Sequence, residues 1–389
     1  MRKYFLMFVL AAGLVSCGKQ SENQTVASTS INVSLEKLDS VRIDYVGNLH
    51  VHDLSPASKT VLFEDRGAYS QEIILADFDG NIISSFSKFG DMPDTYGIML
   101  SSMRLLDDNS FLVYGSHGFL TYDFEGNMLS RVKLVDFEPP SYSPISTGHG
   151  MEKLRDRYLY VNQSFPPNKD YSDNDFYTDM YLLNWLDPKT GKKEPFVQFP
   201  ESSIFRNGKH FFRNAWDPVY HPADDRIYVS FGLEPVIYVF DDSPPYSLLS
   251  SLPLDLPEYR YFKGADEYSS HWTFFMLRFT SGMILNIKKF DGHFLVAYFP
   301  GYNSEDTEMR FSDISPEEAL AFNDRMKQKY PYRIAVLDSA GSLINDFVPE
   351  GLEAYSMLVR NGELWMQETP DEEVEQDYFR LFRVGLKIE

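Results

Sequence analysis

The sequence predicts an all-β fold: a six-bladed β-propeller that occupies residues 33–389 as one domain. Three observations support this prediction. A strand-turn-strand pattern recurs six times along the chain, which is the signature of a repeat architecture. The last copy lacks one strand, whereas a spare strand precedes the first copy. The repeated strands are apolar on both faces, which suits sheets that lie between neighbouring sheets.

Each copy begins with a polar turn and a short apolar strand that is rich in β-branched and aromatic residues. These strands are residues 59–64, 110–115, 157–162, 226–231, 293–298 and 363–367. A second strand then leads into a turn at an acidic residue: Asp79, Glu125, Asp187, Asp241 or Asp338. Such turns predict hairpins, because Gly and Asn accept positive φ and Asp caps the turn. Two hairpins per copy give a four-stranded blade.

The sixth copy predicts how the ring closes. After residues 363–367 it has only one further strand, at residues 378–384. Residues 40–46 alternate in polarity like a strand, and we expect them to complete the last blade and remove exposed sheet edges. The alternatives are a pair of β-sandwiches, which would not give six equivalent units, and a β-helix, which would have shorter and more regular coils.

Long insertions interrupt the later copies at residues 165–179, 201–217, 255–282 and 301–332. The last insertion contains a predicted helix that ends near Lys329, with Ser315 as its N-cap and Pro316 at its first position. Loops on a rigid β scaffold commonly carry binding function. The face of the propeller that bears these loops is therefore the predicted binding face.

The N-terminus predicts export and lipidation. Arg2 and Lys3 precede an apolar run at residues 5–15, which is too short to span a bilayer and indicates a signal peptide at residues 1–16. The tetrapeptide that ends at Cys17 resembles a bacterial lipobox, which implies cleavage before Cys17 and attachment of two or three acyl chains, enough for stable membrane anchoring. The alternative is a signal peptide that contains a cysteine by chance.

The residues after the cleavage site predict a tether and a location. Residues 17–32 are small and polar, and we expect a flexible tether between the lipid and the domain. Gly18 stands where inner-membrane lipoproteins commonly carry Asp, which favours the outer membrane. Cys17 is the only cysteine of the chain, so the mature protein has no intramolecular disulfide.

The charge of the chain excludes one class of partner. The formal net charge is -21, and removal of residues 1–16, which carry two basic and no acidic residues, changes it to -23 (-21 minus 2). Binding to nucleic acid depends on basic surfaces that neutralise phosphates. A surface this acidic repels nucleic acid, and it also keeps an exported domain soluble.

The lipobox, the polar tether and the repeated turns with Asp and Gly together resemble lipoproteins of Bacteroidota that carry a six-bladed, TolB-like propeller. Several such families have no known function. The resemblance extends over almost the whole chain, and it implies the fold and the anchor without supplying catalytic residues, because fold does not determine function.

Six residues in the long loops and at the entry to later copies are the candidate ligand-binding residues: His149, Arg213, Trp216, His221, His271 and Trp272. In a propeller, segments that enter the first strand of a blade lie near the central channel, so these side chains could converge on a pocket for a sugar or a peptide end. The alternative is that each one packs a loop in a chain that is 15% aromatic.

No catalytic, cofactor or metal site is predicted, because the chain has no Gly-x-Ser-x-Gly elbow, no His-Glu-x-x-His and no cysteine cluster. The acidic loop with Asp170, Asp173, Asp175 and Asp179 lacks the spacing of a calcium-binding EF-hand, and we interpret it as solvated. Ser40 and Ser339 follow aspartates in a triplet that resembles the O-glycosylation signal of exported Bacteroidota proteins.

The predicted function is that of a membrane-anchored extracytoplasmic propeller that binds a glycan, a peptide or an envelope protein through its loop-rich face, without catalysis. The main alternative is a propeller enzyme, such as a glycan lyase, lactonase or hydrolase, that uses His149, His221 and His271 at the channel mouth. A purely structural module is the third interpretation; it predicts a channel lined by small or apolar residues.

Overall fold

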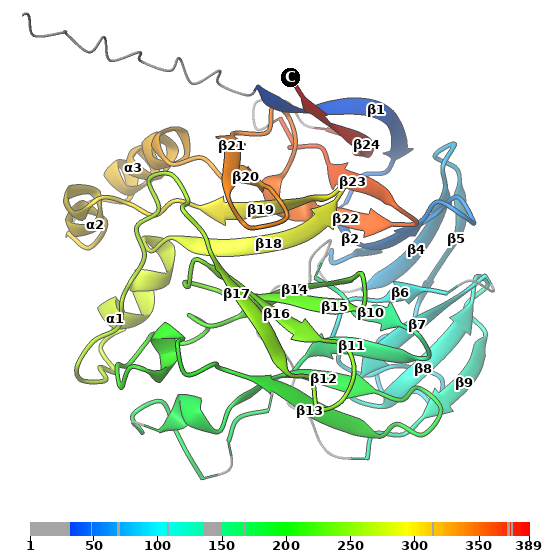
Figure 1. Ribbon diagram of the computed structural model, residues 1–389. Helices are drawn as coiled ribbons and strands as arrows, with labels where there is room; N and C mark the ends of the chain where they lie inside the picture. The colour runs from blue at the N-terminus through cyan, green and yellow to red at the C-terminus, as the bar shows by residue number, and fades with distance from the viewer. Residues whose placement is uncertain are drawn as a thin grey trace, which may run out of the picture. The chain divides into compact units, whose positions relative to one another are not determined.

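Six four-stranded antiparallel sheets follow one another around the molecule and form a six-bladed propeller (Figure 1). The structure is a computed structural model. It describes residues 32–389 apart from 48, 68–70, 107–108, 136–148, 163, 167, 174, 313–314, 372–373 and 375. The predicted fold class is confirmed.

The first three blades have the following strands, each from the innermost to the outermost. Blade 1 consists of β2 (Leu49–Ser55), β3 (Thr60–Asp65), β4 (Glu72–Asp77) and β5 (Ile82–Ser87). Blade 2 consists of β6 (Arg104–Leu105), β7 (Ser110–Gly115), β8 (Gly118–Asp123) and β9 (Met128–Val132). Blade 3 consists of β10 (Glu152–Leu154), β11 (Arg157–Val161), β12 (Tyr181–Leu186) and β13 (Lys193–Gln198).

The other three blades follow the same order, except that the first strand of the chain is the outermost strand of the last blade. Blade 4 consists of β14 (Pro218–Ala223), β15 (Arg226–Phe231), β16 (Val236–Asp241) and β17 (Leu248–Pro253). Blade 5 consists of β18 (Met283–Phe290), β19 (His293–Phe299), β20 (Arg333–Leu337) and β21 (Leu343–Phe347). Blade 6 consists of β22 (Leu358–Arg360), β23 (Glu363–Gln367), β24 (Tyr378–Ile388) and β1 (Val33–Asp44).

The two ends of the described chain close the ring. Strand β1 pairs antiparallel with β24, from Val33 opposite Ile388 to Asp44 opposite Tyr378. Asn32 and Glu389 extend the ladder, because each backbone N–H donates to the carbonyl oxygen of the other at 2.9 Å. The predicted closure by an N-terminal strand is confirmed, but the strand begins earlier than the expected residues 40–46, at Val33, and ends at Asp44.

Apolar side chains fill the space between every two neighbouring blades. Between blades 1 and 2, for example, Leu62 and Ile73 pack with Phe111 and Val113, and all four are fully buried. Each sheet therefore buries both faces, which explains why the repeated strands are apolar on both sides.

Asp side chains cap the outer hairpin turns, as the sequence predicts. In blades 1 and 2, however, the caps are Asp77 and Asp123 rather than Asp79 and Glu125. Asp77 Oδ1 accepts from the backbone N–H of Asn81 at 2.8 Å, and Asp123 Oδ1 accepts from that of Asn127 at 2.7 Å. Gly80 sits in this turn at φ +88°, where a Cβ would come within 2.3 Å of the Arg42 carbonyl oxygen. Only glycine fits this approach of the turn to β1.

The long insertions all emerge on one face of the propeller. In an antiparallel four-stranded blade, the connection from the second to the third strand and the connection to the next blade leave from the same end. The insertions use only these two connections, and α1 (Trp272–Met276), α2 (Ser304–Arg310) and α3 (Pro316–Lys329) accordingly lie together on one side (Figure 1). We call this side the insertion face and the opposite side the turn face.

The helix predicted in the last insertion is confirmed. Helix α3 begins after Ser315, whose side chain accepts from the backbone N–H of Glu318, and Glu318 returns the bond to form a capping box. Helices α1 and α2 were not predicted. The insertions also contain short 3-10 helices: η1 (Phe176–Thr178), η2 (Ile204–Arg206), η3 (Leu277–Phe279) and η4 (Ala354–Ser356).

Candidate functional site

A ring of ionisable side chains lies at the axis, one from the innermost strand of each blade. We call it the axial ring; its members are Asp53, Arg104, Glu152, His221, Lys288 and Arg360. The first five occupy equivalent positions, because each lies opposite the third residue of the second strand of its blade. These partners are, in order, Leu62, Leu112, Leu159, Tyr228 and Leu295. The repeat therefore brings one polar position of each blade to the centre.

Two arginines and two carboxylates of the axial ring form buried ion pairs. Arg360 Nε donates to Asp53 Oδ1 at 2.7 Å, and Arg360 Nη1 donates to both oxygens of Glu152 at 3.1 Å. Arg104 Nη1 also donates to Glu152 Oε2 at 3.1 Å, and Asp53 Oδ2 accepts from the Leu105 backbone N–H at 2.9 Å. These pairs join blades 1, 2, 3 and 6 at the axis. Separation of the blades would break the pairs and leave buried charges without a partner, which is costly.

Burial and the charges of neighbouring side chains shift the pKa values of three members of the axial ring. Burial alone would raise the pKa of Glu152, but the charges of Arg360 and Arg104 lower it to about 2. Burial lowers the pKa of Lys288 to about 8, against the attraction of Glu152. Burial and the nearby Lys288 charge lower the pKa of His221 to about 3. At neutral pH the imidazole is therefore uncharged, whereas the ammonium and the carboxylate are charged.

Hydrogen bonds cross the channel on the insertion-face side of the axial ring. His149 Nε2, which precedes β10, donates to the carbonyl oxygen of Leu285 in β18. Asn286 Nδ2 donates to the carbonyl oxygens of Tyr355 at 2.7 Å and Met357 at 3.0 Å, while its Oδ1 accepts from Lys288 Nζ at 2.7 Å. These bonds tie blades 3, 5 and 6 together across the axis.

Aromatic side chains bind the insertions of blades 3 and 4 into one platform. Trp216 and Tyr177 are buried with ring centroids 5.5 Å apart, and Phe176 lies 5.8 Å from Trp216. Phe262 extends the contacts to the insertion before blade 5, because its ring meets Phe211 at 6.1 Å. The insertions thus form a packed extension of the core rather than separate loops.

A set of exposed apolar residues stands on this platform. Trp272, Phe275 and Phe279 follow a helical spacing along α1 and η3 and are 55%, 42% and 46% exposed. The Trp272 ring lies 6.3 Å from that of Phe311, the C-cap of α2, so α2 with its Met309, 43% exposed, lies beside α1. The Arg278 guanidinium lies over the rings of Phe275 at 5.3 Å and Phe279 at 5.2 Å. We call Trp272, Phe275, Arg278, Phe279 and Met309 the aromatic patch.

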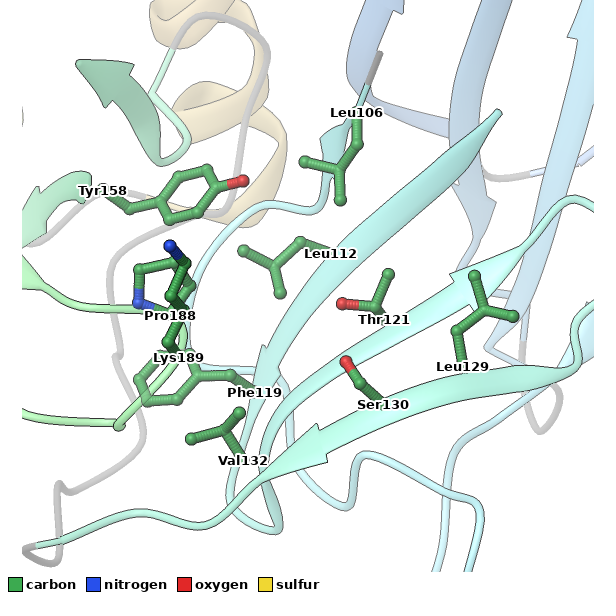
Figure 2. Close-up of a pocket in the computed structure, with 10 residues that line it drawn as sticks. All are labelled: Leu106, Leu112, Phe119, Thr121, Leu129, Ser130, Val132, Tyr158, Pro188 and Lys189. Atoms are coloured by element: carbon green, nitrogen blue, oxygen red, sulfur yellow. The ribbon is translucent and has the colours of Figure 1, made fainter. Parts of the chain in front are cut away.

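A shallow cavity of about 470 Å³ lies between blades 2 and 3 (Figure 2). Its wall includes Leu112, Phe119 and Tyr158, and Figure 2 shows Thr121 and Ser130 side by side on β8 and β9. Leu112, Phe119 and Tyr158 are already 3%, 1% and 5% exposed, so neighbouring residues cover most of this apolar wall. Among the described residues, none that line the cavity has a buried polar atom without a hydrogen-bond partner, whereas His221 of the axial ring has one.

The candidate residues from the sequence lie in separate places. His221 belongs to the axial ring, and His149 crosses the channel on the insertion-face side of the ring. Trp216 is buried in the aromatic platform, where packing against Phe176 and Tyr177 leaves it 4% exposed, whereas Arg213 is exposed.

His271 and Trp272 lie on α1. His271 is its N-cap, and its Nδ1 lies 2.8 Å from Thr273 Oγ1; Trp272 belongs to the aromatic patch. The six candidates thus do not line one pocket, and His271, one of the three histidines of the enzyme alternative, is exposed at the start of a helix. Ligand binding by these residues stays a prediction.

The sequence reasoning missed five members of the axial ring: Asp53, Arg104, Glu152, Lys288 and Arg360. A signal for them exists. A charged residue directly follows an apolar one in the first strand of several copies, as in Met103-Arg104 and Ile287-Lys288. When the copies are aligned, the charged residue within the apolar first strand falls at the same position of several copies.

The acidic loop is held by a lysine. Lys169 Nζ donates to Asp175 Oδ2 at 2.7 Å and Asp179 Oδ2 at 2.6 Å. Within the described ranges, no three His, Cys, Asp or Glu side chains are grouped to hold a metal ion. The same ranges contain no helix with the length and apolarity that a membrane span requires.

Two further sequence predictions concern modification. Ser40 and Ser339 are exposed, and their glycosylation stays a prediction. The signal peptide, Cys17 and most of the tether lie outside the described residues.

The fold defines the class of protein: the chain is a six-bladed propeller. It is similar to a member of the DUF4221 family from Bacteroides vulgatus, with a TM-score of 0.61 at 13% identity over 92% of this chain and 99% of that chain. A protein described as exported, from Bacteroides fragilis, gives a TM-score of 0.48 at 11% identity over 93% and 96% of the two chains. A gluconolactonase from Xanthomonas campestris gives 0.41 at 10% identity over 90% and 89%.

Of these three, the DUF4221 protein, with its TM-score of 0.61, supports a shared fold; an identity of 13% says nothing about activity. No protein-family model matches the chain, and no curated protein matches its sequence.

The protonation of His221 predicts a pH-dependent stability. The unfolded imidazole binds a proton at its ordinary pKa of 6.5, whereas the folded one binds it only near pH 3. Since the unfolded state then holds more protons, the free energy of unfolding falls as the pH drops below 6.5, by up to about 1.4 kcal/mol per pH unit. Urea unfolding of the full-length protein between about pH 6.5 and 4.5, which lies within the range of that shift, measures this slope.

We expect His221→Gln to reduce the slope, because the variant has no imidazole at this position. His271→Gln, on the exposed start of α1, is the matched control and keeps the slope of the wild type. Equal slopes in all three proteins would show that His221 is not buried as a neutral base.

Proposed function

We propose that the protein is a lipid-anchored, extracytoplasmic binding module that holds an envelope protein against its aromatic patch without catalysing a reaction on it. The observation that carries this proposal is the exposure of Trp272, Phe275 and Phe279 on a rigid platform at the insertion face.

The chemistry of the aromatic patch fits a protein partner. Aromatic residues, Met and Arg are enriched at protein interfaces, and Trp and Arg are frequent among the residues that dominate binding energy. Trp272, Arg278 and Met309 supply all three kinds. The patch stands on helices rather than in a pocket, so it offers an area that a complementary protein surface can cover.

The platform favours binding because it fixes the patch in advance. Glu234 anchors the insertion before blade 4: its carboxylate accepts from Ser203 Oγ at 2.7 Å, the Ile204 N–H at 2.9 Å and Tyr238 OH at 2.9 Å. Burial raises the pKa of Glu234. A surface held this way loses little conformational freedom on association, which lowers the entropic cost of binding.

The anchor in this proposal is Cys17. The signal peptide at residues 1–16 and the lipobox support lipidation of its thiol, and Gly18 supports the outer membrane as the destination. Acyl chains at the N-terminus would keep the propeller beside membrane proteins, so a modest affinity of the patch would be enough for stable contact.

A photo-crosslinking amino acid at position 275 tests the aromatic patch. In intact cells of a bacterium that carries the protein natively, we expect it to give a discrete heterologous cross-linked product. The same amino acid at position 129 is the control, because Leu129 is an exposed apolar residue, 58% accessible, on the outer strand of blade 2.

The product from position 275 should also fall at least tenfold when Trp272→Ala and Phe279→Ala are added, which corresponds to about 1.4 kcal/mol or more of binding energy. A product of equal yield from both positions, or none from position 275, contradicts the proposal. A product of twice the chain mass would identify a second copy as the occupant and would also contradict it.

Replacement of Cys17 by Ser tests the anchor. Because the hydroxyl cannot form the thioether to the lipid, we expect the variant to move from the membrane fraction to the soluble fraction and to lose incorporation of labelled palmitate. Ser16→Ala leaves Cys17 in place and is the control. A Cys17→Ser protein that stays in the membrane fraction through a carbonate wash would disprove the lipid anchor.

A further inference from the structure

The cavity between blades 2 and 3 lies in an outer groove, by which we mean the space between the outer strands of two neighbouring blades. Val132, the last residue of β9, lines this groove and pairs with Phe119. The residues that take the same position in the outer strands of blades 1, 3, 4 and 5 are all larger: Phe86, Phe196, Leu252 and Phe347. The groove between blades 2 and 3 therefore lacks bulk that the other blades supply.

The outer turn of blade 3 leaves the same groove open from its other side. In blades 1 and 2, the residue after the capping aspartate is a phenylalanine that packs toward the preceding blade. The ring of Phe78 lies 5.3 Å from that of Trp365 in blade 6, and Phe124 packs against the core between blades 1 and 2. In blade 3 the capping residue is Asp187, and Pro188 stands in place of the phenylalanine and lines the cavity.

Other side chains close the corresponding grooves of blades 4 and 5. Asp242 takes the position of the phenylalanine in blade 4, and it is buried because Arg155 of blade 3 donates to both of its carboxylate oxygens, at 3.0 and 2.8 Å. In blade 5 this residue is the exposed Ser339, but Leu252 of blade 4 reaches the turn, where a Cβ on Gly341 would come within 3.0 Å of it. These two grooves are therefore closed without a phenylalanine.

A hydroxyl replaces an apolar side chain within the open groove. Thr121 lies two residues before the capping aspartate of blade 2. The residues at this position in blades 1, 3, 4 and 5 are apolar and buried: Leu75, Trp185, Val239 and Val336. Figure 2 shows the hydroxyls of Thr121 and Ser130 pointing into the cavity, on the side opposite Lys189. A position that departs from the repeated pattern and leaves a cavity is more typical of a functional site than of a packed core.

The charge beside the cavity favours an anionic ligand. Lys189 lines the cavity and residues 192–193 are also lysines, which is a local excess of positive charge on a chain with a net charge of -21. The acidic residues of this hairpin already have donors: Asp187 accepts from the Lys189 backbone N–H at 2.9 Å, and Glu194 accepts from Arg157 at 3.0 Å. An ammonium group at such a cavity attracts the negatively charged end of a ligand.

We propose that this cavity binds a small aromatic carboxylate. The ring takes the space that phenylalanine side chains fill in the neighbouring groove, and it covers Leu129, which is 58% exposed. The carboxylate accepts hydrogen bonds from the Lys189 ammonium and from the Ser130 hydroxyl. The volume of about 470 Å³ is within the range of about 300–1,000 Å³ that is common for small-molecule sites. The site shares no residue with the aromatic patch and does not depend on the proposed function.

Isothermal titration calorimetry of the full-length protein with sodium phenylacetate tests the proposal, at neutral pH and at a constant ionic strength set with chloride. Benzyl alcohol, which has the same ring without a charge, is titrated in parallel. We expect saturable one-to-one binding of phenylacetate. Binding of benzyl alcohol should be weaker by about tenfold or more, because the alcohol cannot form a charge-assisted hydrogen bond with Lys189.

Two substitutions fill the cavity from opposite sides. Pro188→Phe introduces the side chain that blades 1 and 2 have after the capping aspartate, and Thr121→Leu introduces the residue that blade 1 has at this position. Each should abolish the binding of phenylacetate. Ser339→Phe is the matched control, because Ser339 follows the capping aspartate of blade 5 outside this groove, and it should bind as the wild type does. Circular dichroism verifies folding, and the second variant keeps the test decisive if the first does not fold.

A substitution at Lys189 tests the ligand class. Lys189→Met should weaken the binding of phenylacetate by about tenfold or more and leave that of benzyl alcohol unchanged. Lys192→Met removes an exposed lysine of the same hairpin that does not line the cavity, and it should keep the affinity of the wild type within about twofold, because exposed charges are screened.

The absence of saturable phenylacetate binding, or wild-type affinity in both cavity-filling variants, would overturn the site. An affinity for benzyl alcohol equal to or higher than that for phenylacetate, or an unchanged affinity in Lys189→Met, would overturn the carboxylate as the ligand class.

Discussion

The pairing of β1 with β24 is the constraint on which the rest of the structure depends. Strand β1 comes from the start of the described chain, yet it is the outermost strand of a blade whose other three strands come from the end. It buries Val41 and Ile43 in the core that blades 6 and 1 share, beside Leu358, Trp365 and Leu381 of the other strands of blade 6. The closed ring in turn brings one inner strand of every blade to the axis, where ion pairs such as Arg360–Asp53 join residues 307 positions apart.

Ring closure also divides the molecule into two functional sides. The antiparallel order of each blade sends every insertion to one face, where aromatic packing turns the loops into a platform for Trp272 and its neighbours. The opposite face carries tight turns, such as the one that follows Arg360. The insertion face and the axis are therefore lined by different residues.

Local signals allowed the fold to be predicted, whereas the sites depend on long-range packing. Turns with Asp and Gly, such as the one at Gly80, and the capping sequence at Ser315 form structure within a few residues, so the sequence is sufficient to identify them. Trp216 and Trp272 lie in similar loops, yet tertiary packing buries the first and exposes the second. The charge at Lys288 is visible in the sequence, but its neighbours at the axis become known only when the blades are placed side by side.

Hydrogen–deuterium exchange of the backbone amides in β1 and β24 is the most direct test of ring closure by these two strands. If β1 closes the ring, its amides that face β24 exchange at least about a thousandfold more slowly than unstructured amides, and the two strands lose protection together as denaturant is added. Exchange of residues 33–44 at the rate of an unstructured peptide, with β24 still protected, would show that the ring is not closed by these two strands.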